Sequence, residues 1–209
     1  PVLRDRVVVV PVGAQDEWFA AGQAHLADDD EASASLIFYG LFTPLQGVPT
    51  IARALAILHD RDQLPKVTLL GSGQDYDEVR SILEGVPVTW REWVPAEELP
   101  DFVASHDICL GIVGTTAKAQ RVVPNKVYQG MAAGCAVITS ETPAQTDVLG
   151  DGACFVPPGD PQALADAISM LSSDHRARRS LAKKGYALAS QKFSRRAVVA
   201  DLMSRLERR

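Results

Sequence analysis

The chain has 209 residues, of which 46% are hydrophobic and 22% are charged. This length suits one domain, or one domain with an extension, and no apolar run approaches the ~18 residues that a membrane-spanning helix needs. The net charge of −5 argues against a broad basic face, so we expect no nucleic-acid partner, whereas a small anion would need only a local site.

The cysteines and histidines predict neither a disulfide nor a metal site. Cys109, Cys135 and Cys154 lie in apolar stretches, and their odd number and separation favour reduced, buried thiols and a cytoplasmic compartment. The histidines show no ligand spacing, so we expect no metal. The sequence begins with Pro1 rather than Met and shows no signal segment, so we expect a piece of a longer chain.

The first 34 residues differ from the rest. A β-branched run at 6–11 and an acidic stretch at 28–31 predict a strand followed by a linker. From Ser35 onward, short apolar runs alternate with segments of helical period, which is typical of an α/β fold with a Rossmann-like, three-layer parallel sheet. The predicted strands cover residues 35–39, 67–70, 87–90, 107–111, 135–139 and 153–156.

Helical spacing predicts helices between and after these strands. One helix begins near Asp75, and Asn125 is expected to cap another over 127–133, which Gly134 ends. Asp160 and Ser194 are expected to begin two helices after the last strand, with a third near 175–190 between them. The apolar residues that carry the pattern are Val48, Ile51, Leu55 and Leu58; Leu164, Ile168 and Leu171; and Val198, Leu202 and Leu206.

In an open parallel sheet, ligands bind outside the carboxyl ends of the strands. The loop from Gly40 to Gly47 follows a strand and precedes a helix, so its backbone N–H groups could face a phosphate. The alternative is that these two glycines only permit tight turns. Residues 71–73, Gly-Ser-Gly, are similarly placed but do not complete a dinucleotide-binding pattern.

The segment from Gly111 to Lys126 gathers two glycines, two hydroxyls and three cations before a helix. Lys126 lies in the first turn of that helix, an unfavourable place for a cation unless an anion or a carboxylate answers it. The alternative is a solvated surface lysine. Gln129 lies one turn further on the same face and could bind sugar hydroxyls.

These motifs, taken in order, resemble the C-terminal domain of group 1 (family 4) glycosyltransferases of the GT-B fold. They are the Gly-Leu-Phe-Thr-Pro-Leu-Gln-Gly loop at 40–47, Leu-Leu-Gly-Ser-Gly at 69–73, Trp-Val-Pro at 93–95, Pro-Asn-Lys-Val-Tyr-Gln at 124–129 and Ala-Ala-Gly-Cys-Ala-Val-Ile at 132–138. The resemblance implies that residues 35–209 form a nucleotide-sugar-binding domain. Residues 1–34 would be the interdomain strand and linker leading from an N-terminal domain.

The resemblance also implies a donor site for a UDP- or GDP-linked sugar, with no cofactor and no metal. Phosphate-binding residues would be Gly40, Gln46, Gly47 and Lys126. The base and ribose would meet Gly71, Ser72, Gly73, Trp93, Val94 and Gln129. The sugar side would be lined by Gly114, Thr115, Thr116, Lys118 and Arg121. Hexosyl transfer with retention, and without a protein nucleophile, would follow. The acceptor and any catalytic base would belong to the N-terminal domain, so the isolated chain should be inactive.

Four charged positions of the family are changed. Leu41 and Gln46 stand where many members have Arg and Lys, and Arg121 and Gln129 stand where they have a pair of Glu residues. One reading is a variant donor site. The alternatives are a non-catalytic nucleotide-binding or regulatory module and a GT-B epimerase or phosphorylase.

The C-terminal arginines leave open a peripheral contact with the inner membrane face. Arg205, Arg208 and Arg209 lie at the end of the last predicted helix. Many relatives use lipid-linked acceptors, so such a contact would suit a membrane-associated acceptor. The alternative is a solvated helix end.

Overall fold

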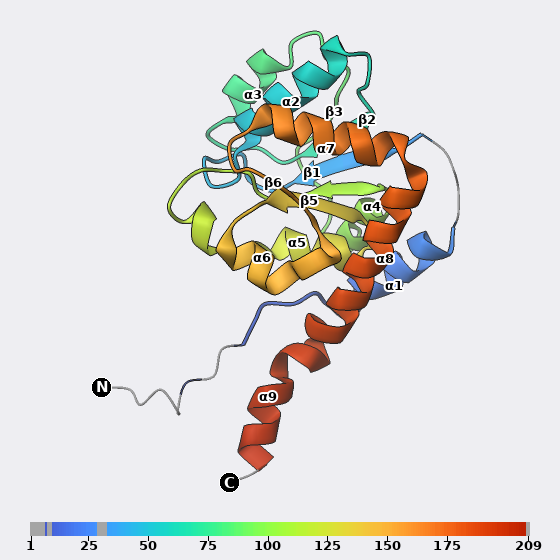
Figure 1. The fold of residues 1–209 in the computed structure, drawn as a ribbon, viewed down its shortest axis with the longest axis vertical. Coiled ribbons are helices and arrows are strands. Elements are labelled where there is room, and N and C mark those ends of the chain that lie inside the picture. The colour runs from blue at the N-terminus through green and yellow to red at the C-terminus, as the bar shows by residue number, and fades with distance from the viewer. Residues whose placement is uncertain (1–6, 8–9, 29–32, 208–209) are drawn as a thin grey trace.

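The computed structural model describes residues 7, 10–28 and 33–207. Its centre is one sheet of six parallel strands in the order β3-β2-β1-β4-β5-β6 (Figure 1). The strands are β1 Ser35–Tyr39, β2 Lys66–Leu70, β3 Thr89–Arg91, β4 Ile108–Leu110, β5 Ala136–Ser140 and β6 Cys154–Val156. All six predicted strands are present, and the predicted Rossmann-like fold is confirmed.

Both faces of the central strands are buried, which explains their continuous apolar runs. Leu36 and Phe38 of β1 point into one hydrophobic core, and Ile37 and Tyr39 point into the other. Strand β1 pairs with β2 on one side and with β4 on the other. The order of the strands reverses there, so the carboxyl ends of β1 and β4 border the crevice in which ligands of such sheets bind.

Helices cover both faces of the sheet. They are α1 Asp16–Ala27, α2 Val48–Asp60, α3 Tyr76–Ile82, α4 Leu99–Ala104, α5 Asn125–Ala132, α6 Pro143–Leu149, α7 Pro161–Ser173, α8 His175–Lys192 and α9 Arg195–Glu207. Helices α2, α3 and α7 contribute to one core, whereas α1, α4 and α5 contribute to the other. Helix α8 reaches both cores, and α9 projects away from the sheet (Figure 1).

The helix-end predictions are confirmed at Asp160, Gly134 and Ser194, after which α9 begins, and are wrong at Asn125. Asp160 caps α7 by accepting hydrogen bonds from the N–H groups of Gln162 and Ala163. Gly134 follows α5 with a φ of 77°, a conformation that favours glycine. Asn125 does not cap α5, because the helix already begins there and the cap position is Pro124, which has no side-chain acceptor.

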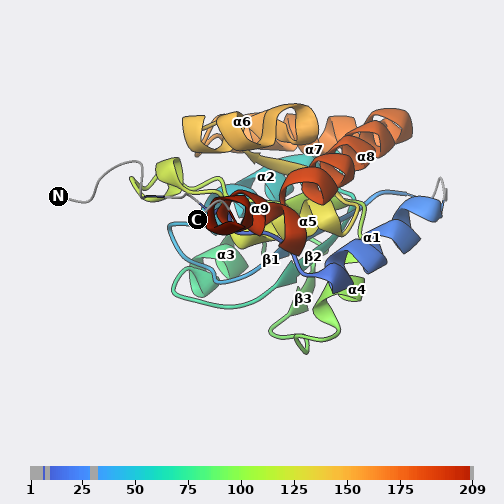
Figure 2. The same ribbon diagram turned by 90° about the horizontal axis from the view of Figure 1, so that it is seen from below.

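Residues 16–27, within the segment predicted as strand and linker, form helix α1. Its Trp18 is 4% exposed and stacks on Tyr39, with ring centroids 6.2 Å apart. Gly22 allows the close approach of α1 to α5, because a Cβ atom there would lie 2.0 Å from the Ala132 carbonyl oxygen. Figure 2 shows α1 beside α4. Of the predicted strand at 6–11, residues 6, 8 and 9 lie outside the described residues, and residues 7, 10 and 11 do not form a strand.

The three cysteines are unpaired, and Cys109 and Cys135 are buried as predicted. Burial raises the pKa of Cys109 to about 12, so its thiol stays protonated and unreactive at neutral pH. Within the described ranges, no helix has both the length and the apolar character to cross a bilayer.

Candidate functional site

The loops that follow β1, β2 and β4 meet at the carboxyl edge of the sheet. The Phe42 N–H group donates to the Ser72 carbonyl at 2.9 Å, which joins the first loop to the second. The Val113 N–H group donates to the Gln46 carbonyl at 3.1 Å, which joins the first loop to the third. Residues 40–47, 71–73 and 111–116 therefore form one surface at the point where the strand order reverses.

Glycines make this convergence possible. Gly47 has a φ of 71°, and a Cβ atom there would lie 2.5 Å from the Gly114 nitrogen. A Cβ atom on Gly114 would lie 2.4 Å from the Leu45 carbonyl oxygen, and one on Gly71 would lie 2.0 Å from that of Gly40. Gly47 thus does permit a tight turn, and this turn also brings the start of α2 against the loop that follows β4.

Lys126 is buried at this edge, not solvated. The side chain is 6% exposed, and its Nζ atom lies 3.8 Å from the centre of the Phe38 ring and 5.8 Å from that of Tyr39. A Cβ atom on Gly40 would lie 3.0 Å from Nζ, so the absence of a side chain at Gly40 leaves room for the amine. Burial lowers the pKa of Lys126 to about 7, against a smaller opposing effect of Cys109.

Within the described part of the chain, no acceptor forms a hydrogen bond with this amine. The Nζ atom has no hydrogen-bond partner, and no described carboxylate forms an ion pair with it. The cation–π contact with Phe38 offsets only about 0.5–2 kcal/mol of the cost of burying a charge. A buried amine of this kind is suited to bind an anion that lies outside the described residues.

Other buried polar atoms without hydrogen bonds lie on the same edge. Gln46 Oε1 follows β1, Asp75 Oδ2 follows β2 and Thr142 Oγ1 follows β5. Buried polar atoms are normally paired. Each of these three atoms thus lies in a loop at the carboxyl edge of the sheet, where a bound ligand would supply the missing hydrogen bonds.

Gln129 lies one turn of α5 beyond Lys126 and is half-buried. Its Oε1 atom accepts a hydrogen bond from the Tyr39 hydroxyl at 3.2 Å, and the same hydroxyl lies 3.3 Å from the Lys126 carbonyl oxygen. The structure thus brings Lys126 and Gln129 together with Gly40. The sequence analysis did not include Tyr39 among the site residues, because Tyr39 continues the apolar run of a buried strand.

The predicted sugar-side residues differ in exposure, and Gly114 is buried against Leu45. Thr115, Lys118 and Arg121 are exposed. The Thr116 hydroxyl accepts a hydrogen bond from the Ala119 N–H group at 3.2 Å, and the Arg121 Nε–H group donates to the Ala117 carbonyl at 3.0 Å. These contacts stabilise the 3₁₀ turn at Ala119–Arg121, and the cations of Lys118 and Arg121 remain at the surface.

The residues predicted for the base are also open to solvent. Ser72 and Gly73 are exposed, Val94 is half-buried against the second core, and Trp93 is 74% exposed. Leu41, which stands at a position of a family arginine, is 68% exposed. The loop that follows β1 therefore presents an apolar side chain to solvent at Leu41.

The sequence analysis did not predict a buried polar network between β5 and the loop that follows β4. Gln145 is fully buried and bridges two side chains of β5, accepting from Thr139 Oγ1 at 2.6 Å and donating to Ser140 Oγ at 3.0 Å. Ser140 in turn donates to the Ile112 carbonyl at 2.8 Å. This network supports the loop that begins at Gly111. A glutamine near a predicted strand end gives little sign of such burial.

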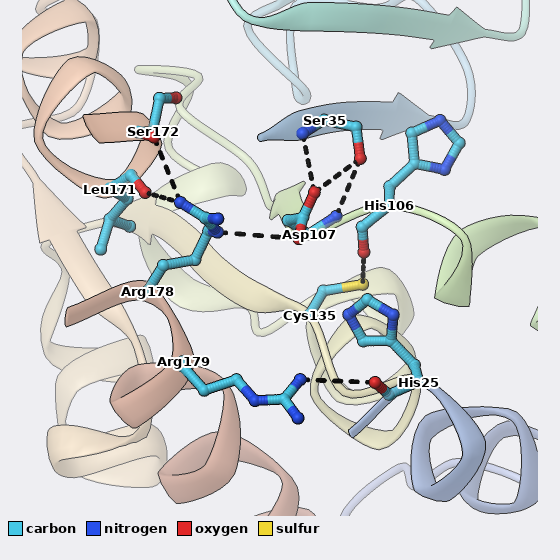
Figure 3. Close-up of polar contacts among 9 residues, drawn as sticks. All are labelled: His25, Ser35, His106, Asp107, Cys135, Leu171, Ser172, Arg178 and Arg179. Atoms are coloured by element: carbon cyan, nitrogen blue, oxygen red, sulfur yellow. Dashed lines mark hydrogen bonds and ion pairs between the residues drawn. The ribbon is translucent and has the colours of Figure 1, made fainter. Parts of the chain in front are cut away.

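A hollow of about 390 Å³ lies at the amino ends of the strands. Two arginines and Asp107 in its lining form contacts within the fold (Figure 3). Arg178 donates to the Leu171 carbonyl at 2.8 Å and lies 3.7 Å from Asp107, while Arg179 donates to the His25 carbonyl at 3.4 Å. The arginines satisfy carbonyl groups at the ends of α7 and α1, so this hollow is explained as a structural junction.

A family model described as "Glycosyl transferases group 1" matches residues 33–174. The chain belongs to the group 1 glycosyl transferases. The match covers the sheet and all three loops of the candidate site, so the positions compared with the family in the sequence lie inside the matched region. No match was found among curated proteins.

Solved structures of other glycosyl transferases share the fold. The C-terminal domain of the group 1 protein LpcC of Francisella tularensis aligns with a TM-score of 0.66 and 18% identity, covering 89% of this chain and 97% of that domain. HepE of Anabaena, in complex with UDP, aligns with a TM-score of 0.75 and 18% identity over 97% of this chain. Sucrose-phosphate synthase of Thermosynechococcus elongatus aligns with a TM-score of 0.70 and 23% identity over 96% of this chain.

This group 1 chain is shorter than those whole enzymes. It spans 57% of the HepE chain and 52% of the sucrose-phosphate synthase chain.

Proposed function

We propose that the chain is the donor-binding domain of a glycosyltransferase, holding a UDP- or GDP-linked sugar for transfer to an acceptor bound by an N-terminal domain. One observation carries this proposal: Lys126 has a buried amine without a hydrogen-bond partner among the described residues, placed against Gly40 where the strand order reverses. The complexes of HepE with UDP and with UDP-glucose support it by analogy of fold.

The chemistry of such a transfer suits this site. The leaving group is a nucleoside diphosphate, whose negative charge grows as the glycosidic bond breaks. Lys126 would meet a phosphate oxygen, and the N–H groups at the start of α2, beside Gly47, would add donors. Transfer would retain configuration and need no protein nucleophile, metal or cofactor from this chain. The catalytic base and acceptor groups would come from the other domain, so the chain alone would bind a donor without transferring its sugar.

Calorimetric titration with UDP, GDP and ADP tests the donor site. We expect one of the three to bind, and Lys126→Met to weaken it about 10- to 100-fold, because a charge-assisted hydrogen bond is lost. Lys183→Met is the matched control, since Lys183 is an exposed lysine on α8. If none of the three nucleotides binds the unmodified chain, the proposal is wrong.

Leu41 favours a second candidate, a nucleotide-binding module without catalysis. Its exposed apolar side chain stands where many family members have an arginine, and losing one preorganised donor costs about 3–4 kcal/mol in such sites. The intact protein distinguishes the two functions. Sugar transfer or slow donor hydrolysis by the full-length chain supports the enzyme, whereas tight nucleotide binding without either supports the module.

The unpaired cysteines support a cytoplasmic location as part of this proposal. A membrane-associated acceptor would place the protein at the inner membrane face. Of the C-terminal arginines, Arg205 lies in α9, whereas Arg208 and Arg209 lie outside the described residues.

A further inference from the structure

Tyr39 carries the only side-chain hydroxyl that meets Gln129 in the described structure. It is the last residue of β1 and is 6% exposed. Its hydroxyl lies 3.2 Å from Gln129 Oε1 and 3.3 Å from the Lys126 carbonyl oxygen. A buried hydroxyl needs a partner, and both partners here lie on the turn of α5 that borders the crevice. The phenol therefore ties the end of β1 to that turn.

The phenol is held in one place and one protonation state. Trp18 of α1 stacks on the Tyr39 ring with an interplanar angle of 18°, and the ring is buried in the core that α1 and α5 share. Burial raises the pKa of Tyr39 well above its usual value, so the hydroxyl keeps its proton at neutral pH and remains a donor. Gln129 thus meets a fixed hydrogen-bond donor.

This contact decides which end of the Gln129 amide is available. The phenol occupies Oε1, and the amide N–H groups have no hydrogen-bond partner among the described residues. A glutamine fixed by its oxygen presents two N–H donors, which a glutamate cannot do. Resting on the proposed function, we propose that Tyr39 is a positioning residue that orients Gln129 to donate to a ribose hydroxyl of a nucleoside diphosphate.

Tyr39→Phe removes only the hydroxyl and provides the test. Titrations would compare UDP, GDP and ADP with their 2′-deoxy and 3′-deoxy counterparts. We expect the unmodified chain to favour the ribonucleotide over at least one deoxy form by about 2- to 10-fold, the range of one hydrogen bond. Tyr39→Phe should bring this ratio close to one while leaving affinity for the deoxy form within about 2-fold. Gln129→Leu should do the same, and the double variant should lose nothing more.

Tyr186→Phe is the matched control, since the Tyr186 hydroxyl donates to the Phe19 carbonyl at 3.1 Å, between α8 and α1. It should lose stability but keep the ribose preference. Two results would overturn this inference without affecting the proposed function. Nucleotides bind but Tyr39→Phe still prefers the ribonucleotide, or Tyr39→Phe weakens binding of the ribose and deoxyribose forms equally. Absence of any nucleotide binding by the unmodified chain would overturn both the inference and the proposed function.

Discussion

The Nζ atom of Lys126 lies 3.8 Å from the centre of the Phe38 ring and has no hydrogen-bond acceptor among the described residues. Phe38 belongs to the core on one face of β1, and Tyr39 belongs to the core on the other. The amine therefore lies buried at the end of β1, between the two cores. This position makes the lysine sensitive to both pH and ligand.

Donor binding should weaken as the pH rises above neutrality. The pKa of Lys126 is lowered to about 7 in the free chain, and a bound diphosphate would raise it. Binding then favours the protonated amine, so affinity is highest below pH 7 and falls between pH 7 and the higher pKa of the complex. Titrations with a sugar nucleotide such as UDP-glucose, whose diphosphate does not titrate in this range, would measure the fall.

Lys126→Arg gives the control for that pH dependence, because a guanidinium stays charged throughout. If Lys126→Arg still binds the nucleotide, its affinity should stay constant between about pH 6.5 and about pH 9, a range that includes the pKa of Lys126. An equally steep fall in Lys126→Arg would assign the dependence to another group. A flat profile for the unmodified chain would contradict the prediction.

The same lysine should make the fold less stable near neutrality. Its folded pKa lies below that of an unfolded lysine, so the unfolded state binds more protons between the two values and the free energy of unfolding rises with pH across this range. Lys126→Met should remove the penalty and stabilise the chain by roughly 1–3 kcal/mol at pH 7. Urea unfolding at pH 7 and pH 10 would check this. A Lys126→Met chain less stable than the original at pH 7 would contradict it.

Gly47→Ala should open the site and destabilise the fold. Alanine at this position would have to adopt a φ of 71°, and its methyl group would lie 2.5 Å from the Gly114 nitrogen. We therefore expect the free energy of unfolding to fall by about 2–4 kcal/mol and nucleotide binding to be lost. Gly85→Ala is a matched control, since Gly85 has a φ of 80° with no heavy atom near its Cβ position. It should cost about 1 kcal/mol and leave binding unchanged. Thermal unfolding and titration of both variants provide the measurement.

Gln145→Leu should destabilise the chain although it increases apolar character in the core. It leaves the hydroxyls of Thr139 and Ser140 without one of their partners in a fully buried place, at a cost of about 2–4 kcal/mol. Gln162→Leu is the control, since Gln162 is exposed on α7 and bonds to Asp166 at the surface. Equal unfolding free energies for the two variants would show that the buried network contributes little.

The sheet was predictable because its strands carry local signals. The runs at 35–39 and 135–139 are apolar at nearly every position, which only a strand buried on both faces requires, and Asp160 and Gly134 lie where helix ends need them. The convergence of the loops after β1, β2 and β4 was predictable because the carboxyl ends of parallel strands meet at one edge. The position of Lys126 in the first turn of a helix favoured an anion or a carboxylate as its partner, and its burial excludes the alternative of a solvated lysine.

The remaining features depend on contacts that no short window contains. Helix α1 has little amphipathic pattern and holds its place through Trp18 on Tyr39 and Gly22 on Ala132. The pairing of Tyr39 with Gln129 joins residues far apart in sequence. Asn125 resembled a cap because of its residue type, but the chain turns into α5 one residue earlier.

Helix α1 also constrains how this domain can be exchanged between proteins. A domain grafted from Ser35 onward would lose Trp18 and Gly22, which would uncover Tyr39 at the end of β1 and the part of α5 around Ala132. A chimera that carries α1 with the sheet should keep its nucleotide preference. One that takes α1 from the host protein would have to match an unfamiliar helix to a tyrosine at the end of β1.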